Sequence, residues 1–223
     1  MGALEIIVKN QGLSDYLPIW RAMQNFTKSR DENSTDELWI VEHNPVYTLG
    51  RNGKQEHILN ETKIPIVKVD RGGQVTYHGP GQLVIYLLLD LQRRHLGVRQ
   101  LVTLIENTII NLLAEYNLEA KSDKKAPGVY IDGKKIAALG LRVSKGKTTH
   151  GLSLNINMNL APFKNINPCG YENLEVIQCK DLGVEDNIQV IGDKLAKLLV
   201  KQLCFLRLPK SQKVRRESRS ESQ

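Results

Sequence analysis

The sequence predicts a single α+β domain with mixed or antiparallel sheets and packed helices. Strand-length apolar segments return in hairpins, with amphipathic helical segments inserted between them. This order favours an α+β class over a doubly wound parallel sheet. The chain has 223 residues, of which 41% are hydrophobic, enough for one substantial core. We expect residues 1–209 to form this domain, with no internal repeat and no linker.

The first half of the chain predicts one helix and three strands. In residues 13–30, apolar side chains recur every three residues at Leu17, Trp20, Met23 and Phe26, which predicts an amphipathic helix. A strand is expected at residues 37–43, and two more within residues 63–91. The last of these, residues 82–91, is apolar at nearly every position, as in a strand buried on both faces.

The second half predicts two helices around a meander. Residues 98–118 carry one apolar helical stripe, made of Leu101, Leu104, Ile105, Thr108, Leu112, Leu113 and Tyr116. Within residues 128–160, Asp132-Gly133 predicts a type I′ hairpin turn, which needs positive φ at both positions. Residues 150–160 alternate, with apolar side chains at the even positions from Leu152 to Leu160. A final amphipathic helix is expected at residues 186–206.

Composition indicates a cytoplasmic protein with acidic partners. The net charge is +7, and residues 208–223 hold two Lys and three Arg against two Glu. We expect a disordered basic tail at residues 210–223. Aromatic residues make up only 5% of the chain and do not interleave with basic ones, which argues against nucleic acid as a partner. No apolar run approaches the about 18 residues of a membrane span, and no signal peptide is recognisable.

Three cysteines need an explanation. Cys204 lies in an apolar helical run and is expected to be a core side chain, while Cys179 has no informative neighbours. No cysteine or histidine cluster has the spacing of a metal site, so no metal is expected. Cys169 lies between Pro168 and Gly170. Packing, a disulfide bond, metal binding and catalysis are the four roles considered for it.

Two further features are not required by folding. Residues 70–82, DRGGQVTYHGPGQ, contain four glycines, which suits either an irregular turn or a backbone that a ligand approaches closely. Lys135 opens a strand of small and apolar side chains, where desolvation would lower its pKa. Spacing alone nevertheless favours a strand-end lysine that points to water.

Four segments, RGGQVTYHGPGQ, KIAALGLRV, THGLSLN and INPCG, together resemble the lipoyl(octanoyl) transferase family, over residues 38–176. The departures are mild: Tyr130 stands where the family often has Trp, and Ser153 where Ala is common. The resemblance implies the fold of biotin and lipoate protein ligase catalytic domains. It also implies transfer of an octanoyl or lipoyl group from octanoyl-acyl carrier protein to a lysine of an acceptor. The acceptors would be lipoyl domains of 2-oxoacid dehydrogenase complexes and the glycine cleavage H protein.

The resemblance also assigns roles to residues. Cys169 matches the nucleophile that carries the acyl group as a thioester, and Lys135 matches the lysine that lowers the pKa of that thiol. No cofactor is implied, and a basic surface suits acidic carrier and lipoyl domains. The implied substrate-binding residues are Arg71, Gly72, Gly73, Gln74, Val75, Thr76, Tyr77, His78, Ala138, Leu139, Gly140, Gly151, Leu152 and Ser153.

Three alternatives remain beside this reading. An ATP-dependent lipoate or biotin protein ligase would share the fold but needs no cysteine nucleophile. A non-catalytic binding protein would not need the Lys135 and Cys169 pair. A lipoyl amidotransferase would use a related cysteine mechanism, so only its substrates would distinguish it.

Overall fold

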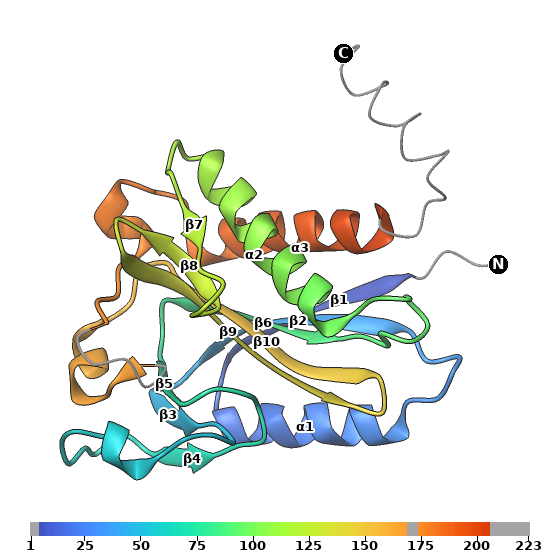
Figure 1. Cartoon of the computed structure of the whole chain (residues 1–223), viewed down its shortest axis with the longest axis horizontal. Coiled ribbons are helices and arrows are strands. Elements are labelled where there is room, and N and C mark those ends of the chain that lie inside the picture. The colour runs from blue at the N-terminus through green and yellow to red at the C-terminus, as the bar shows by residue number, and fades with distance from the viewer. Residues whose placement is uncertain (1–4, 169–173, 206–223) are drawn as a thin grey trace.

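The computed structural model describes residues 5–168 and 174–205, which form two sheets covered by helices (Figure 1). The strands are β1 (Ile6–Ser14), β2 (Asp36–His43), β3 (Val46–Leu49), β4 (Ile66–Lys68), β5 (Val75–His78), β6 (Gln82–Leu88), β7 (Lys121–Ser122), β8 (Gly128–Ile131), β9 (Lys134–Ser144) and β10 (Lys147–Asn155). The α-helices are α1 (Tyr16–Ser29), α2 (Val98–Ala114) and α3 (Ile188–Phe205). Short 3₁₀ helices are η1 (Gln55–His57), η2 (Ala161–Asn165) and η4 (Cys179–Leu182).

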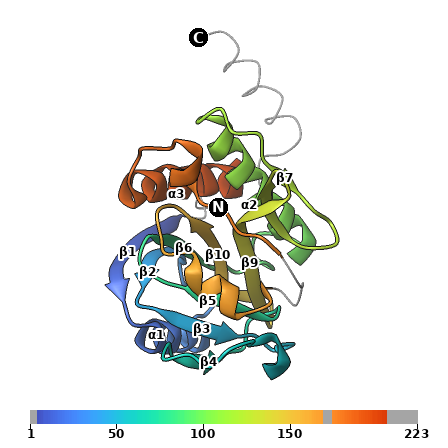
Figure 2. The same cartoon turned by 90° about the vertical axis from the view of Figure 1, so that its left-hand side faces the viewer.

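The larger sheet has seven strands in the order β1-β2-β6-β10-β9-β8-β7, and the smaller has the order β4-β3-β5. The β1–β2 and β3–β4 pairs are parallel and the other pairs are antiparallel. Helices α2 and α3 cover one face of the larger sheet, while α1 and the smaller sheet lie against the other (Figures 1 and 2). The predicted α+β class with mixed sheets is therefore confirmed.

The β8–β9–β10 meander turns through two tight connections. Asp132 and Gly133 have φ values of 49° and 78°, which agrees with the predicted type I′ turn. Lys145 and Gly146 repeat the pattern at the next turn, with φ values of 50° and 77°. Because both turns are short, β8, β9 and β10 lie side by side in the larger sheet.

Several sequence predictions need correction. The edge strand β1 and the short strand β3 were not expected, and residues 63–91 contain three strands, β4, β5 and β6, where two were predicted. In α1, Leu17 is exposed, and the buried residues are Tyr16, Ile19 and Met23. Of the predicted stripe, Met23 is buried and Trp20 and Phe26 are partly buried against the same cluster, so only Leu17 was assigned wrongly.

The other two differences concern the second half. Strand β10 ends at Asn155. The predicted alternation of burial continues beyond it, but Met158 packs in the small-sheet cluster and not with Ile156. Cys204 is exposed, because it lies next to the buried Leu203 on the edge of the α3 stripe, whereas Cys179 is buried. The expected tail at residues 210–223 lies outside the described residues. No helix in the described ranges is long and apolar enough to span a membrane.

Candidate active site

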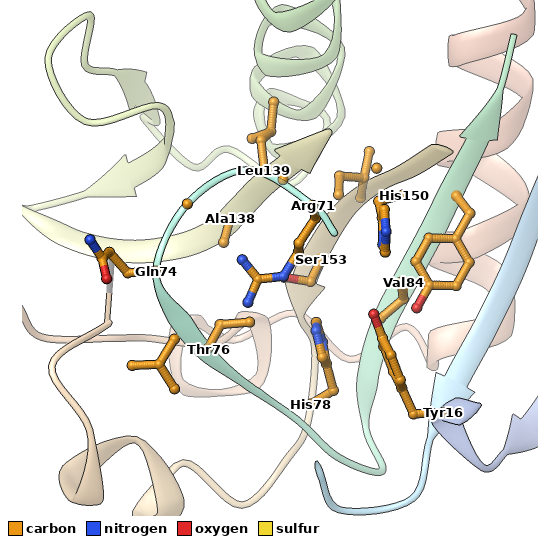
Figure 3. A pocket seen from close by; sticks show the side chains of 16 residues that line it. Tyr16, Arg71, Gln74, Thr76, His78, Val84, Ala138, Leu139, His150 and Ser153 are labelled. Atoms are coloured by element: carbon orange, nitrogen blue, oxygen red, sulfur yellow. The ribbon is translucent and has the colours of Figure 1, made fainter. Parts of the chain in front are cut away.

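A narrow pocket lies between the two sheets, with an open interior of about 50 Å³ (Figure 3). Strands β6, β9 and β10 supply its floor, and β5, the loop before β5 and α1 supply its cover. It is lined by Tyr16, Arg71, Gly73, Gln74, Val75, Thr76, His78, Val84, Tyr86, Ala138, Leu139, Gly140, His150, Gly151, Leu152 and Ser153. The structure thus brings three separate sequence motifs to one cavity.

Of the predicted substrate-binding residues, all except Gly72 and Tyr77 line this pocket. The amide of Gly72 instead donates to the carbonyl of Leu141, at 3.0 Å, and joins the loop to β9. Tyr77 faces the opposite side of β5 from its neighbours Thr76 and His78, because side chains alternate along a strand. It packs against Phe163 with ring centroids 5.5 Å apart.

Two glycines in the floor of the pocket allow neighbouring parts of the chain to approach closely. A Cβ atom on Gly140 would lie 3.1 Å from Cδ of Arg71, and one on Gly151 would lie 2.0 Å from the carbonyl oxygen of Ile85. The second distance is shorter than any real contact, so β10 approaches β6 at this point only because residue 151 has no side chain. The floor is therefore smooth and apolar where it faces Arg71.

Arg71 reaches into the middle of the pocket, between Ala138 and Thr76 (Figure 3). Its Nη2 donates to the carbonyl and hydroxyl oxygens of Thr48, at 2.6 and 2.7 Å, and its Nη1 donates to the carbonyl of Gly72 at 2.9 Å. These bonds hold the guanidinium, which is buried. Arg71 therefore occupies the centre of the pocket.

Sequence reasoning did not find four lining residues: Tyr16, Val84, Tyr86 and His150. Nε2 of His150 donates to Asp70 Oδ1 at 2.8 Å. This hydrogen bond, together with one from Trp20, keeps the pKa of Asp70 far below its usual value. His150 stands inside the THGLSLN segment, so the motif itself was the available signal, whereas Tyr86 lies in a uniformly apolar strand that gives no sign of which face it occupies.

The buried histidines beside the pocket are neutral at physiological pH. Burial lowers the pKa of His78 to about 3 and that of His43 to about 4. Nε2 of His43 lies 2.7 Å from the hydroxyl of Tyr86, so this ring is tied into the wall of the pocket. A neutral imidazole with so low a pKa is a poor proton acceptor.

Lys135 is only 3% exposed, which corrects the expectation from spacing that it points to water. Its Nζ lies 5.2 Å from the ring centroid of Tyr130, and a Cβ atom on Gly128 would lie 3.4 Å from that nitrogen. The absence of a side chain at Gly128 therefore makes room for the ammonium group. The end of the Lys135 side chain is therefore shielded from bulk water.

A second, smaller cavity connects Lys135 with the pocket. It shares Thr76, Ala138 and Ser153 with the larger pocket and is also lined by Lys135 and Pro168. Cys169, the residue after Pro168, lies outside the described residues. In the described part of the chain, no three His, Cys, Asp or Glu side chains are grouped to hold a metal ion.

Comparison with known proteins places this site in a family. The model of the lipoyl protein ligase A/B catalytic domain matches residues 15–199, which include every pocket residue and Lys135. The chain belongs to this family. Within it, the chain is 58% identical over 202 residues to an octanoyltransferase of Azoarcus sp. (strain BH72), covering 90% of this chain and 89% of that protein.

A second family member, an octanoyltransferase of Aliivibrio fischeri (strain ATCC 700601 / ES114), is 57% identical over 206 residues, covering 90% of this chain and 91% of that protein. These relatives confirm the resemblance to octanoyltransferases drawn from the four motifs.

Solved structures agree with the family fold. A lipoate-protein ligase A solved with ATP superposes with a TM-score of 0.74 at 14% identity, over 89% of this chain and 85% of that one. The biotin protein ligase of Aquifex aeolicus with biotin and ATP gives a TM-score of 0.55 at 14% identity, over 89% and 70%. The predicted ligase-like fold of this family member is thus confirmed.

Proposed function

We propose that this chain is an acyltransferase that moves an octanoyl group from acyl carrier protein to a lysine of a lipoyl domain, through a thioester on Cys169. The observation that carries the proposal is the burial of Lys135 in a cavity that adjoins the glycine-floored pocket. Pro168 lines the same cavity, and the chain continues from it directly to Cys169. Octanoyltransferase relatives at 54–58% identity support the same activity.

The chemistry needs a thiolate and a proton acceptor. Lys135 in its neutral form takes the proton of the Cys169 thiol, and the thiolate attacks the thioester carbonyl of the donor. The carrier sulfur leaves as a thiolate and takes the proton back from Lys135, so one thioester replaces another and no ATP is used. The lysine amine of the acceptor then attacks the enzyme thioester, and Lys135 takes a proton from that amine. The bond between the acyl carbon and Cys169 breaks as the amide forms, and Cys169 leaves as a thiolate that takes the proton back from Lys135.

The pocket suits the acyl chain rather than the reacting carbonyl. Its floor at Ala138, Gly140 and Gly151 is apolar or lacks side chains, and it adjoins the cavity that holds Lys135. His78 and His43 are too weakly basic to replace Lys135 as the proton acceptor. Burial also lowers the pKa of His150, whose Nε2 donates to Asp70, so Lys135 is the acceptor that we propose.

The proposed partners follow from the same chemistry. The donor is octanoyl-acyl carrier protein, and the acceptors are lipoyl domains of 2-oxoacid dehydrogenase complexes and the glycine cleavage H protein. Such carriers are acidic, so the net charge of +7 would speed both encounters. A cytoplasmic location is part of this proposal.

Two other activities fit the fold. An ATP-dependent ligase is the closest alternative, because solved ligases share the fold, but the fold carries no information on activity at 14% identity. A lipoyl amidotransferase would use Cys169 in the same way and differs only in its donor.

Intact-mass spectrometry of the protein mixed with octanoyl-acyl carrier protein, without ATP, tests the proposal. We expect one octanoyl adduct that localises to Cys169 and disappears when an apo lipoyl domain is added. An adduct from octanoylated lipoyl domain alone would instead identify the amidotransferase. Absence of any adduct, with modification only when octanoate and ATP are supplied, would identify a ligase.

A further inference from the structure

Three buried side chains form a hydrogen-bonded row between the pocket and the backbone that pairs with Lys135. Nδ1 of His78 lies 2.7 Å from Oε1 of Gln82, and Nε2 of Gln82 donates to Oδ1 of Asn155 at 3.0 Å. Nδ2 of Asn155 donates to the carbonyl of Ile177 at 3.0 Å. Gln82 is 1% exposed and Asn155 5% exposed, so water does not compete for these bonds.

The direction of the row is fixed by two backbone carbonyls. The carbonyl of Ile177 can only accept, so the Asn155 atom facing it is the amide nitrogen, and its oxygen must face Gln82. The carbonyl of Tyr77, 3.3 Å from Nε2 of Gln82, orients the second amide in the same sense. The remaining Gln82 oxygen can only accept, so Nδ1 of His78 carries the proton. All three side chains thus have a single consistent arrangement.

The row ends on the segment that brackets Lys135. The amide of Ile177 donates to the carbonyl of Lys135 at 3.0 Å, and the amide of Lys135 donates to the carbonyl of Glu175 at 2.8 Å. Gln82 and Asn155 also line the small cavity that holds the Lys135 side chain. Movement of either amide would therefore shift the backbone on which Lys135 is held.

We propose that Gln82 and Asn155 are positioning residues for acyl transfer, which hold Lys135 and residues 174–177 in one register against the floor of the pocket. This inference rests on the proposed function. Neither amide needs to touch the substrate, since both act through the backbone of Ile177. His78 belongs to the same row and orients Gln82 from the pocket side.

Packing alone does not account for two buried amide side chains at this place. Buried amides are tolerated only when every polar atom is satisfied, and apolar side chains of similar size can replace a complete pair at little cost. In this row, three side chains together orient one backbone carbonyl, that of Ile177. Its value lies in orientation, because an error of about 1 Å at a reacting group can cost on the order of 10²-fold in rate.

The test compares Asn155→Leu and Gln82→Leu with Thr108→Val. Thr108 is a matched control, because it is also buried and donates to a backbone carbonyl, that of Leu104 at 2.7 Å, but in α2. We expect both row variants to slow octanoyl-enzyme formation on the order of 10²-fold, with KM for octanoyl-acyl carrier protein unchanged. Thr108→Val should keep the wild-type rate. Circular dichroism shows whether each variant folds, and Gln82→Glu, which keeps the acceptor for His78 but loses the donor to Asn155, replaces any variant that does not.

A double-variant cycle distinguishes positioning of Lys135 from general damage. If Asn155 acts through Lys135, Asn155→Leu raises the apparent pKa of Cys169 alkylation in the wild-type background. It should then cause no further shift in a Lys135→Met background. Equal shifts in both backgrounds, or a wild-type rate for both row variants, would overturn the inference. Failure of the wild-type protein itself to form an acyl adduct would instead refute the proposed function.

Discussion

The two faces of the seven-stranded sheet have opposite character although the same strands build both. On the face covered by α2 and α3, β6 and β10 present Leu83, Ile85, Leu87, Leu152 and Leu154, all in one apolar cluster. On the other face, the alternate positions are Gln82, Val84, Tyr86, Gly151, Ser153 and Asn155, which border the two cavities. Alternation along a strand lets one segment contribute to stability through one face and to chemistry through the other.

The comparison predicts that a change on one face should alter folding stability, and a change on the other should alter reactivity. The largest expected contrast is between Cys179, on the helix-covered face, and Cys169, the proposed nucleophile, which lies outside the described residues. We expect Cys169→Ser to abolish octanoyl transfer without a change in melting temperature. Cys179→Ser should keep most activity, because burial raises the pKa of that thiol to about 12 and leaves it unreactive. Cys179 packs in the helix-covered cluster, so its replacement should cost about 1 kcal/mol of stability.

Transfer assays and thermal melts of the same samples check both halves of this contrast, and the exposed Cys204→Ser serves as the control that changes neither. Full activity of Cys169→Ser would refute the thioester mechanism.

The next effect concerns Lys135. Lys135→Met keeps much of the aliphatic stem but removes the proton acceptor, so the apparent pKa of Cys169 alkylation should rise. Transfer should fall by about 10²- to 10⁴-fold, the usual contribution of a general base. Lys135→Arg keeps a positive charge that favours the thiolate but cannot act as a base near neutral pH. It should restore part of the thiolate without restoring transfer to the acceptor amine. Coincident alkylation profiles for wild type and Lys135→Met would show that the two residues are not coupled.

The floor of the pocket should control chain length. Gly140→Leu and Ala138→Phe fill space beside Arg71, so we expect both to slow octanoyl transfer about 10- to 200-fold and acetyl transfer much less. Val143→Leu is the control, because Val143 lies on the same strand β9 but is exposed and outside the pocket. Rates measured with acyl carrier proteins that bear two to eight carbons give the comparison. Equal losses for short and long chains would show that the floor does not border the acyl chain.

The smallest effect is on pH dependence. His43 and His78 have pKa values of about 4 and about 3 in the folded protein, whereas a histidine in the unfolded chain has a pKa of about 6.5. Between the folded and the unfolded pKa values, the unfolded chain therefore binds more protons than the folded protein. Stability therefore rises with pH through this window and is lost as pH falls. We expect a lower melting temperature at pH 5 than at pH 7, and a smaller difference in His43→Gln.

His95→Gln should leave this difference unchanged, since His95 is exposed. A wild-type melting temperature that is the same at both pH values would contradict the neutral state assigned to the buried histidines.

Local patterns explain which parts of the molecule could be predicted. The helix at residues 98–118 and the Asp132-Gly133 turn depend on neighbours in the sequence, and both were found. Tyr86 was missed because β6 is apolar throughout, and its face is decided only by pairing with β10, far away in the chain. Edge strand β1 was missed for a similar reason, since only β2 completes it. Arg71, His78 and Ser153 were predicted to share a site through the resemblance of their segments to a known family. The periodicity of the sequence carries no such information.

The short turns of the β8–β9–β10 meander have a consequence for the order of folding. Contacts between residues close in sequence form at low entropic cost, so hairpins with two-residue turns assemble early. Residues 128–155 carry Lys135, Ala138, Gly140, Gly151, Ser153 and Asn155. We therefore expect these residues to reach their positions within residues 128–155 first. The N-terminal strand β1 and helix α1, which are distant in the sequence, would pack against them later. Helix α1 is then the last part of the pocket's cover to be placed, and a folding intermediate would present the floor of the pocket to solvent with Tyr16 not yet above it.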